Sequence, residues 1–153
     1  MKKIIWISIT ICSLFLVACS QQSKPEFSKP LFSPSVCIEK NCFHTEIAST
    51  PAEREYGLMN RTSMPEQSGM IFIFEKEDSY SFWMKDTLIP LDMIRIDSGM
   101  NIVGIEEATP CTGPDASCTI YNPGKPASYV LEINYGISKK LGIQTGQKAI
   151  ITK

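Results

Sequence analysis

Four residues have side chains that could together bind a small ligand: Arg61, Trp83, Lys85 and Asp92. Trp83 and Lys85 are two positions apart, so they share one face if their segment is a strand. Asp92 lies in an apolar row, where a carboxylate is costly unless paired, so we expect it to meet Arg61 or Lys85. With Trp83 as a stacking wall, these residues predict a pocket for a small polar or anionic ligand. The alternative is a structural ion pair with Trp83 in the core.

Acid–base catalysis is a second chemistry that the carboxylates allow. Asp92 and Glu132 could act as the acid and base of a hydrolase or lyase, and Tyr121 is a further polar candidate. That reaction requires both carboxylates to open onto one cleft, within about 10 Å of each other. Nucleophilic catalysis has less support, because His44 is the sole histidine and no activated nucleophile accompanies it. The sequence favours a binding protein over an enzyme and predicts no cofactor.

Methionines offer a third chemistry, the binding of Cu(I) by thioether sulfurs. Six methionines follow the N-terminal region: Met59, Met64, Met70, Met84, Met93 and Met100. Most stand in apolar segments or beside leucine, where methionine is ordinary core filler. Copper handling therefore stays an alternative that requires three sulfurs to converge, and the sequence predicts no metal site.

The cysteines bear on the compartment in which the chain works. Of the six, Cys12 lies in an apolar leader and Cys19 directly follows it. The other four are Cys37, Cys42, Cys111 and Cys118. An even count in an exported chain favours disulfides, and the short separations favour local pairs, 37 with 42 and 111 with 118. Each pair would stabilise the fold by roughly 2–2.5 kcal/mol in the chain-entropy model. A four-thiolate zinc site is the competing interpretation.

The first eighteen residues have the features of a signal peptide. Lys2 and Lys3 precede an apolar run, Ile4–Val17, which is shorter than the roughly 20 residues of a membrane span. The run ends in Leu-Val-Ala-Cys, which resembles the lipobox of bacterial lipoproteins. That resemblance implies cleavage before Cys19, lipidation of its sulfur and a permanent membrane anchor in the cell envelope. Ser20 implies the outer membrane, facing the periplasm, in a cell that has two membranes.

Residues 19–35 form a predicted tether between the anchor and one domain over residues 36–153. Three prolines and five serines leave the tether too little apolar surface to fold alone. Over the whole chain, 15 Lys and Arg against 16 Asp and Glu give a net charge of −1. No basic stripe is present, so we expect no nucleic-acid partner and expect the lipid to make the membrane contact. The sequence indicates no particular protein partner.

The elements that must position these residues are mostly short strands. Apolar runs bounded by turn residues predict strands over 36–39, 42–48, 70–75, 80–85, 91–97, 102–108, 128–133 and 148–152. Thr50-Pro51-Ala52-Glu53 is a capping-box sequence that predicts a helix to about Met59. Asn134 is expected to cap a second short helix that ends near Gly142. The sequence therefore predicts an α+β domain, with two short helices and a mostly antiparallel sheet that could curl into a barrel.

Several segments of the chain resemble the DUF192 family of uncharacterised proteins. They are Glu53-Arg54, Gly57–Arg61, Gly69–Phe72, Phe82–Met93, Pro110-Cys111, Cys118, Tyr121 and Tyr129–Glu132. The resemblance runs from about Glu46 to Thr152 and implies a compact β-rich domain, often exported, with no established reaction. Family members often have Asn where this chain has Asp86, and an aromatic or aliphatic residue where it has Arg95. The sequence therefore predicts a lipid-anchored envelope protein that is a small-ligand-binding or accessory module.

Overall fold

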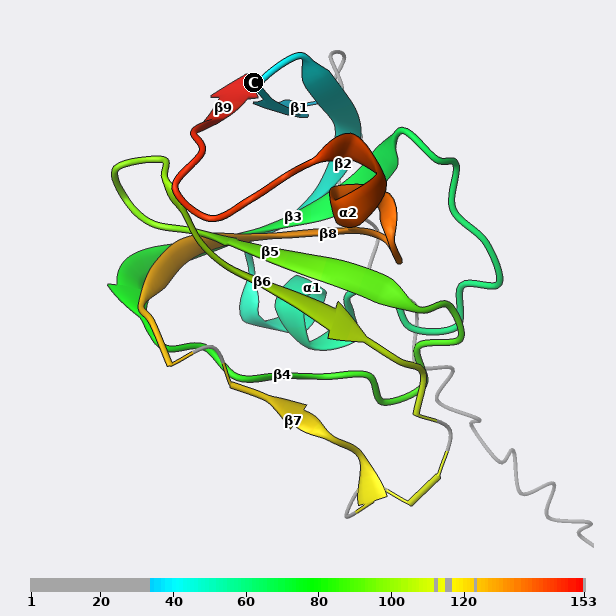
Figure 1. Cartoon of the computed structure of the whole chain (residues 1–153). Coiled ribbons are helices and arrows are strands. Elements are labelled where there is room, and N and C mark those ends of the chain that lie inside the picture. Colours follow the sequence, from blue (N-terminus) through cyan, green and yellow to red (C-terminus); the bar gives the residue numbers. More distant parts are fainter. Residues whose placement is uncertain (1–33, 112, 115–116, 123, 153) are drawn as a thin grey trace, which may run out of the picture.

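The structure, a computed structural model, describes residues 34–111, 113–114, 117–122 and 124–152 (Figure 1). The predicted signal peptide, Cys19 and nearly all of the predicted tether lie outside these residues. The strands are β1 (Ser35–Ile38), β2 (Asn41–Ala48), β3 (Ser68–Asp78), β4 (Phe82–Trp83), β5 (Leu91–Ile96), β6 (Ile102–Ala108), β7 (Ile120–Tyr121), β8 (Ala127–Asn134) and β9 (Ala149–Thr152). The helices are α1 (Pro51–Tyr56) and α2 (Ile137–Leu141). Within the described ranges, no helix combines the length and the apolar character that crossing a membrane requires.

Seven strands form one curled sheet in the order β6-β5-β8-β3-β2-β1-β9 (Figure 1). Neighbouring strands are antiparallel except β2 and β3, which run parallel because α1 carries the chain between them. An isolated bridge between Asn101 and Lys148 links the turn before β6 to the chain before β9. β4 and β7 form a separate two-stranded ribbon. The predicted α+β class, with a mainly antiparallel sheet and two short helices, is confirmed.

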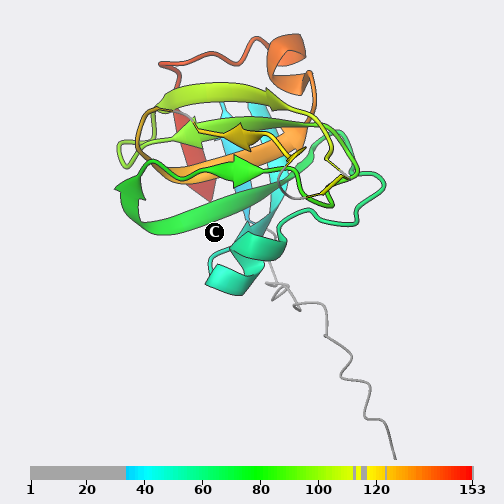
Figure 2. The same ribbon diagram turned by 90° about the horizontal axis from the view of Figure 1, so that it is seen from below.

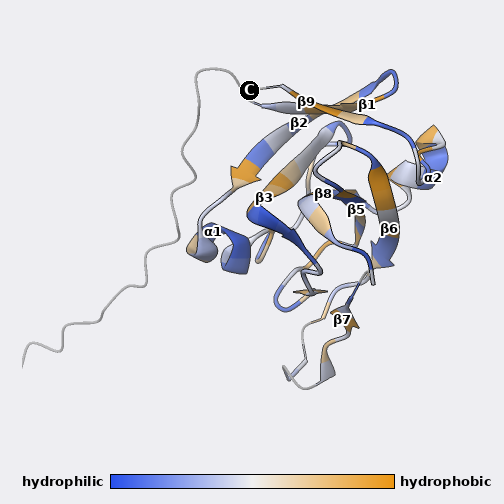
Figure 3. Ribbon diagram, turned by 90° about the vertical axis from the view of Figure 1, so that its left-hand side faces the viewer, coloured by the Kyte–Doolittle hydropathy of each residue, from blue (hydrophilic) through white to orange (hydrophobic). Residues whose placement is uncertain are grey.

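Alternation along the strands divides the apolar side chains between two cores. On β8, Leu131 and Ile133 point into a first core that α2 and β9 also enter. Val130 points into a second core on the opposite face, and Glu132 shares that face. Figure 2, seen from below, shows β4 and β7 in front of the sheet, where Phe82 and Tyr121 pack against this second core. In Figure 3, β3 changes from hydrophobic to hydrophilic toward its end, where residues 75–78 are exposed.

Helix α1 begins with the predicted capping box. Thr50 Oγ1 accepts a hydrogen bond from Glu53 N at 3.3 Å, and Glu53 Oε2 accepts one from Thr50 N at 2.9 Å. The helix ends at Tyr56, three residues before the predicted end, because Gly57 has a φ of +46°. A Cβ at Gly57 would lie 3.2 Å from the Phe72 ring, so glycine also lets the chain turn closely against β3.

Several elements differ from the sequence prediction: β7 was not predicted, and β3 extends to Asp78 where the predicted strand ends at residue 75. The strand predicted over 80–85 forms a ladder only at Phe82–Trp83, opposite the two residues of β7, and Lys85 makes an isolated bridge to Cys111. Helix α2 begins after Gly136, which has a φ of +76°, and not at Asn134. The Asn134 amide instead donates to main-chain oxygens of residues 64 and 65, at 3.0 and 3.1 Å. A residue outside the helix therefore has to cap α2.

Both predicted disulfides are present. Cys37 and Cys42 are cross-strand partners at the end of the β1–β2 hairpin and are bonded to each other. Cys111 is bonded to Cys118 in the segment that leads into β7. The main chain of Cys111 also donates to the oxygen of Met84 at 3.1 Å, which fixes this loop beside β4. All four sulfurs are used in disulfides, so they do not form the alternative zinc site.

Candidate functional site

A cavity of about 230 Å³ lies between α1, β3 and the β4 segment, on the side of the second core. Residues 54–59 of α1 and its C-terminal turn line one side, and Phe72 and Phe74 of β3 line another. The β4 segment contributes residues 80–83 and Thr87. Glu132 contributes from β8, the strand between β3 and β5 in the sheet. The fold therefore encloses a small space between its sheet and the elements that cover it.

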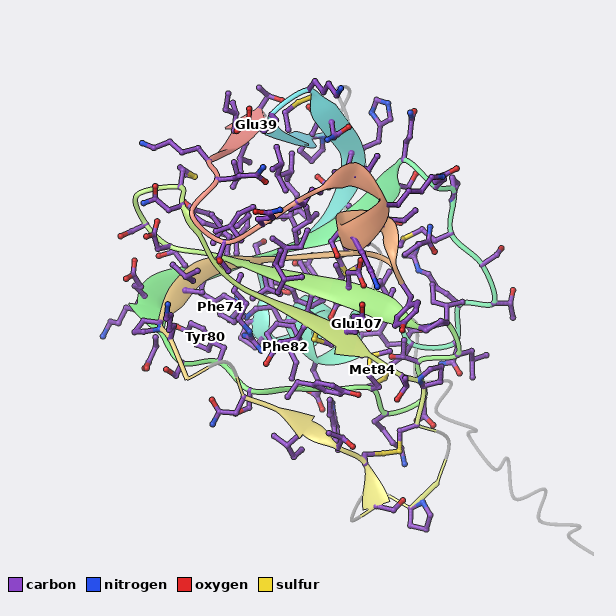
Figure 4. The ribbon with its side chains drawn as sticks, viewed as in Figure 1. Glu39, Phe74, Tyr80, Phe82, Met84 and Glu107 are labelled. Carbon is purple, nitrogen blue, oxygen red and sulfur yellow. A yellow bond between two sulfur atoms is a disulfide. The ribbon has the colours of Figure 1, made fainter. Side chains whose placement is uncertain are left out.

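Aromatic side chains form one wall of this cavity. Phe82 meets Phe72 edge to face, with ring centroids 5.1 Å apart, and lies 6.3 Å from Phe74. Tyr80 stacks on Phe74 with 3.6 Å between the centroids. Figure 4 shows Phe74, Tyr80 and Phe82 grouped below the sheet, with Met84 farther along the same segment. Ring pairs of this kind contribute about 0.5–1.5 kcal/mol each beyond their buried area, so the wall is firmly packed.

Glu132 places a carboxyl group in this apolar surrounding. The residue is 4% exposed, and its cross-strand partners are Met70 and Met93. No group in the described part of the chain hydrogen-bonds to this carboxyl. Every fully enclosed side-chain oxygen or nitrogen of the described residues has a partner, so the Glu132 oxygens must open onto the cavity.

The protonation state of Glu132 follows from this burial. Removal from water raises the pKa of Glu132 from 4.5 to about 8, while the positive charge of Arg95 acts in the opposite direction. The group is therefore mostly protonated at neutral pH. A protonated carboxyl has an O–H donor, which can donate a hydrogen bond to a molecule in the cavity.

Arg95 is fully buried near Glu132 and has its own partners. Its guanidinium forms an ion pair with Glu106 at 2.9 Å. It also donates to the main-chain oxygens of Tyr80 at 2.8 Å and Tyr121 at 3.3 Å. Burial lowers the pKa of Arg95, and the Glu106 carboxylate acts against that shift. Arg95 therefore fastens β7 and the segment just before β4 to the sheet, a role that was not predicted from the sequence.

The residues predicted to line one pocket are not brought together. Trp83 lines the cavity and is 38% exposed. Arg61 instead forms a two-pronged ion pair with Glu46, at 2.5 and 2.6 Å. The main chain of Lys85 forms an isolated β-bridge with Cys111 in the adjacent loop. Neither Arg61 nor Lys85 lines the cavity, so Trp83 is the contribution of this predicted set to the observed site.

Asp92 does not pair with Arg61 or Lys85, which corrects the sequence prediction. Its buried carboxylate accepts hydrogen bonds from Gly136 N at 2.9 Å, Ser138 N at 2.8 Å and Ser138 Oγ at 2.6 Å. Asp92 thus caps α2, where a carboxylate also interacts favourably with the helix dipole. Asp92 does not need Arg61 or Lys85 as a partner, because N–H groups of the main chain donate hydrogen bonds to its carboxylate.

The structure also does not form the predicted acid–base pair of Asp92 and Glu132. Asp92 pairs with Ile133, the residue after Glu132, in the β5–β8 ladder. Neighbouring positions on a strand point to opposite faces, so the two carboxylates lie on opposite sides of the sheet. Tyr121, the further candidate, accepts a hydrogen bond at its hydroxyl from Thr109 N, at 3.1 Å.

The methionines pack as core residues. Met70, Met84 and Met93 are fully buried in the second core, and Met59 lines the cavity. Within the described ranges, no group of three or more His, Cys, Asp or Glu side chains could hold a metal ion. The described residues therefore offer no cluster of such side chains to support the copper alternative.

Asp86 has a conformational role at the edge of this region. It takes a φ of +53°, and Asn60 takes a φ of +61°. The Asn60 N–H donates to the Asp86 oxygen at 2.8 Å, which ties the turn after α1 to the turn after β4. Asn and Asp adopt this left-handed conformation more readily than other side chains. Asp86 therefore stands at a left-handed position that an Asp side chain tolerates.

The segments that carry the family resemblance meet around the cavity. Each of the segments 57–61, 69–72, 82–93 and 129–132 contributes at least one residue to its lining. A family model named DUF192 and described as "Uncharacterized ACR" matches residues 35–151. The chain belongs to the DUF192 family. The resemblance stated from the sequence is thereby confirmed.

Two solved structures are similar to this DUF192 chain. A proposed transcription regulator from Sinorhizobium meliloti 1021 is 34% identical, with a TM-score of 0.69, over 77% of this chain and 91% of its own. A protein of unknown function from Novosphingobium aromaticivorans DSM 12444 is 35% identical, with a TM-score of 0.68, over 76% of this chain and 82% of its own. None of the curated proteins matches the chain. The DUF192 fold is therefore shared by all three proteins.

Proposed function

We propose that this DUF192 protein is a ligand-binding module of the cell envelope, anchored by lipid on Cys19, and that its ligand occupies the Glu132 cavity. The ligand presents an oxygen acceptor to the Glu132 O–H and an apolar surface to the aromatic wall. The two disulfides support an oxidising compartment. The lipobox-like sequence at residues 16–19 supports the anchor.

The unpartnered carboxyl of Glu132 is the observation that carries this proposal. A buried polar group without a hydrogen bond destabilises a fold, and an apolar side chain would pack better between Met70 and Met93. Groups that break this rule while facing a cavity are typical of functional sites. A ligand that accepts a hydrogen bond from Glu132 would remove the penalty, which favours the bound state.

The size of the cavity limits the ligand. Its volume of about 230 Å³ is below the roughly 300–1,000 Å³ of sites that hold drug-sized molecules. An apolar cavity of about 150 Å³ is sufficient to hold benzene. The cavity therefore suits a single substituted ring or a molecule of similar size.

A role in transcription, as proposed for the S. meliloti protein, is not extended to this chain. Its net charge of −1 provides no excess of cations for a nucleic-acid backbone. Two of its three arginines, Arg61 and Arg95, are paired with carboxylates.

Catalysis is a second candidate function, and a specific observation supports it. Glu55 lines the same cavity as Glu132, so two carboxyl groups border one space, although not the pair predicted from the sequence. A protonated Glu132 could act as a general acid at neutral pH. This alternative requires the bound molecule to be chemically changed.

Ligand binding is tested with two variants that differ in one property. Glu132→Gln keeps a hydrogen-bond donor, whereas Glu132→Leu removes it. The full-length chain in detergent is screened for thermal shifts against small neutral and anionic metabolites, and hits are recovered for mass spectrometry. We expect wild type and Glu132→Gln to be stabilised by the same compounds, and Glu132→Leu to lose these shifts while melting higher without ligand.

The results of this screen distinguish ligand binding from catalysis. Compounds that shift Glu132→Leu as strongly as wild type would contradict the proposed site. Recovery of the hits unchanged supports a binding module. Conversion by wild type, but not by Glu55→Gln, would favour the catalytic alternative.

A further inference from the structure

Arg54 occupies the junction between the cavity and a second, more open space. It lines the Glu132 cavity together with Phe74 and Tyr80. The same three residues line a neighbouring groove of about 550 Å³, with Pro51, Glu75 and Lys76. The two spaces therefore adjoin at Arg54, and a molecule in the cavity would have this guanidinium at its outer end.

The hydrogen bonds of Arg54 leave part of its guanidinium unused. Nη1 donates to the main-chain oxygen of Ser49 and to that of Ile73, the latter at 3.1 Å. Neither Nη2 nor Nε has a hydrogen-bond acceptor among the described residues. Arg61 and Arg95 differ in this respect, since each is paired with a carboxylate. Arg54 thus presents a charge that no carboxylate of the described ranges neutralises.

The guanidinium is also held in a fixed place. Its Cζ lies 5.2 Å from the centroid of the Phe74 ring, which is itself stacked on Tyr80. The two main-chain oxygens hold one edge of the group and the ring supports its face. The free edge is therefore preorganised to bind two oxygens of one anionic group.

The other charged side chains nearby do not form an ion pair with Arg54. Glu55 lies on the cavity wall, and the opposite charges of Glu75 and Lys76 lie on the groove. Glu53, on the same helix, accepts hydrogen bonds from the main chain of Ser49 and Thr50. None of these side chains pairs with the guanidinium in the described structure.

We infer that the ligand of the Glu132 cavity carries a carboxylate or phosphate that Arg54 binds at the junction with the groove. This inference rests on the proposed function and names its ligand class. The ligand is a small, flat molecule, with an anionic group at Arg54, an apolar body on the aromatic wall and an oxygen acceptor at Glu132. A single ring with substituents at opposite ends has this arrangement and fits the volume of about 230 Å³.

The test compares probes that differ in charge. Isothermal titration of the full-length chain in detergent uses 4-hydroxybenzoate, 4-hydroxyphenyl phosphate and the neutral 4-hydroxybenzamide. We expect at least one anion to bind wild type about tenfold or more tightly than the amide, with an affinity that falls as salt is added. Which anion binds better distinguishes a carboxylate ligand from a phosphate ligand.

Two arginine variants provide the matched comparison. Arg54→Met should remove the preference for the anion and leave the amide affinity little changed. Arg61→Met, which removes an arginine outside the cavity, should keep the preference. If Arg54→Met fails to fold, the comparison of anion with amide on wild type still decides the question.

Other outcomes would overturn the inference. Equal binding of anions and amide by wild type, with both lost in Glu132→Leu, would remove the role of Arg54 but leave the cavity as the binding site. An anion preference that Arg54→Met retains, or no binding of any probe, would also contradict it.

Discussion

The carboxyl group of Glu132 holds its proton more tightly in the folded chain than in the unfolded chain, because burial raises its pKa from 4.5 to about 8. Its contribution to stability is complete below about pH 4.5 and is lost as the pH rises to about 8, since the unfolded chain ionises first. The free energy of unfolding should therefore fall across this window, by at most about 1.4 kcal/mol per pH unit. Urea unfolding of wild type and Glu132→Gln at several pH values measures this slope, which the variant should lose.

Carboxyl groups whose pKa is lowered by folding do not produce the same slope. A main-chain hydrogen bond from Thr50 lowers the pKa of Glu53, and hydrogen bonds from Ser98 lower that of Glu77. These groups act at lower pH and in the opposite direction. The difference between wild type and Glu132→Gln therefore isolates Glu132, and equal slopes would show that this carboxyl is not protonated in the folded chain.

At the level of elements, the contact between β3 and β8 depends on Gly69. A Cβ at this position would lie 2.5 Å from the main-chain oxygen of Glu132, which is too close for any side chain. Gly69→Ala should therefore destabilise the fold by about 1–3 kcal/mol, because the two strands must separate where Glu132 is positioned. Chemical denaturation measures the loss.

Gly104 on β6 provides the control for this prediction. A Cβ there would meet the Arg95 side chain at 3.9 Å, an ordinary contact. Gly104→Ala should change stability by less than about 1 kcal/mol, and a gain is consistent with the reduced freedom of the unfolded chain. Similar losses in both variants would contradict the strand register around Glu132.

Local patterns allowed many of these elements to be predicted from sequence. The strand predicted over 102–108 matches β6 at both ends, and the capping box of Thr50 and Glu53 starts α1 as expected. The two disulfides were predicted from the short separations between paired cysteines, in a chain whose sequence predicts export. Each of these features depends on residues close together in the chain, where turn chemistry and periodicity carry the information.

The cavity could not be predicted in the same way, because it depends on strand register and on distant contacts. Phe72 and Phe82 have the sequence features of ordinary core residues, and only the fold places them beside Glu132. Asp92 is satisfied by main-chain N–H groups 44 and 46 residues away, which no side-chain pattern reveals. Glu132 was named as a candidate, but for a pairing with Asp92 that the alternation of neighbouring strands excludes.

For the whole molecule, the proposal places the binding domain on a lipid anchor at Cys19. Cells that express the chain should incorporate radiolabelled palmitate into it, and Cys19→Ser should abolish both the label and membrane attachment. The disulfide variant Cys37→Ser with Cys42→Ser serves as the control and should keep the label. A mature N-terminus at another residue, or attachment that survives Cys19→Ser, would contradict the anchor.

The most direct test of the central claim is a carbon-13 NMR titration of the Glu132 side-chain carboxyl, assigned by its loss in Glu132→Gln. We expect a pKa near 8 without ligand, and a higher pKa with a ligand that accepts the carboxyl proton in a hydrogen bond. Titration near 4.5, or a pKa that a bound ligand leaves unchanged, would contradict the claim that this carboxyl is protonated, open to the cavity and used to bind.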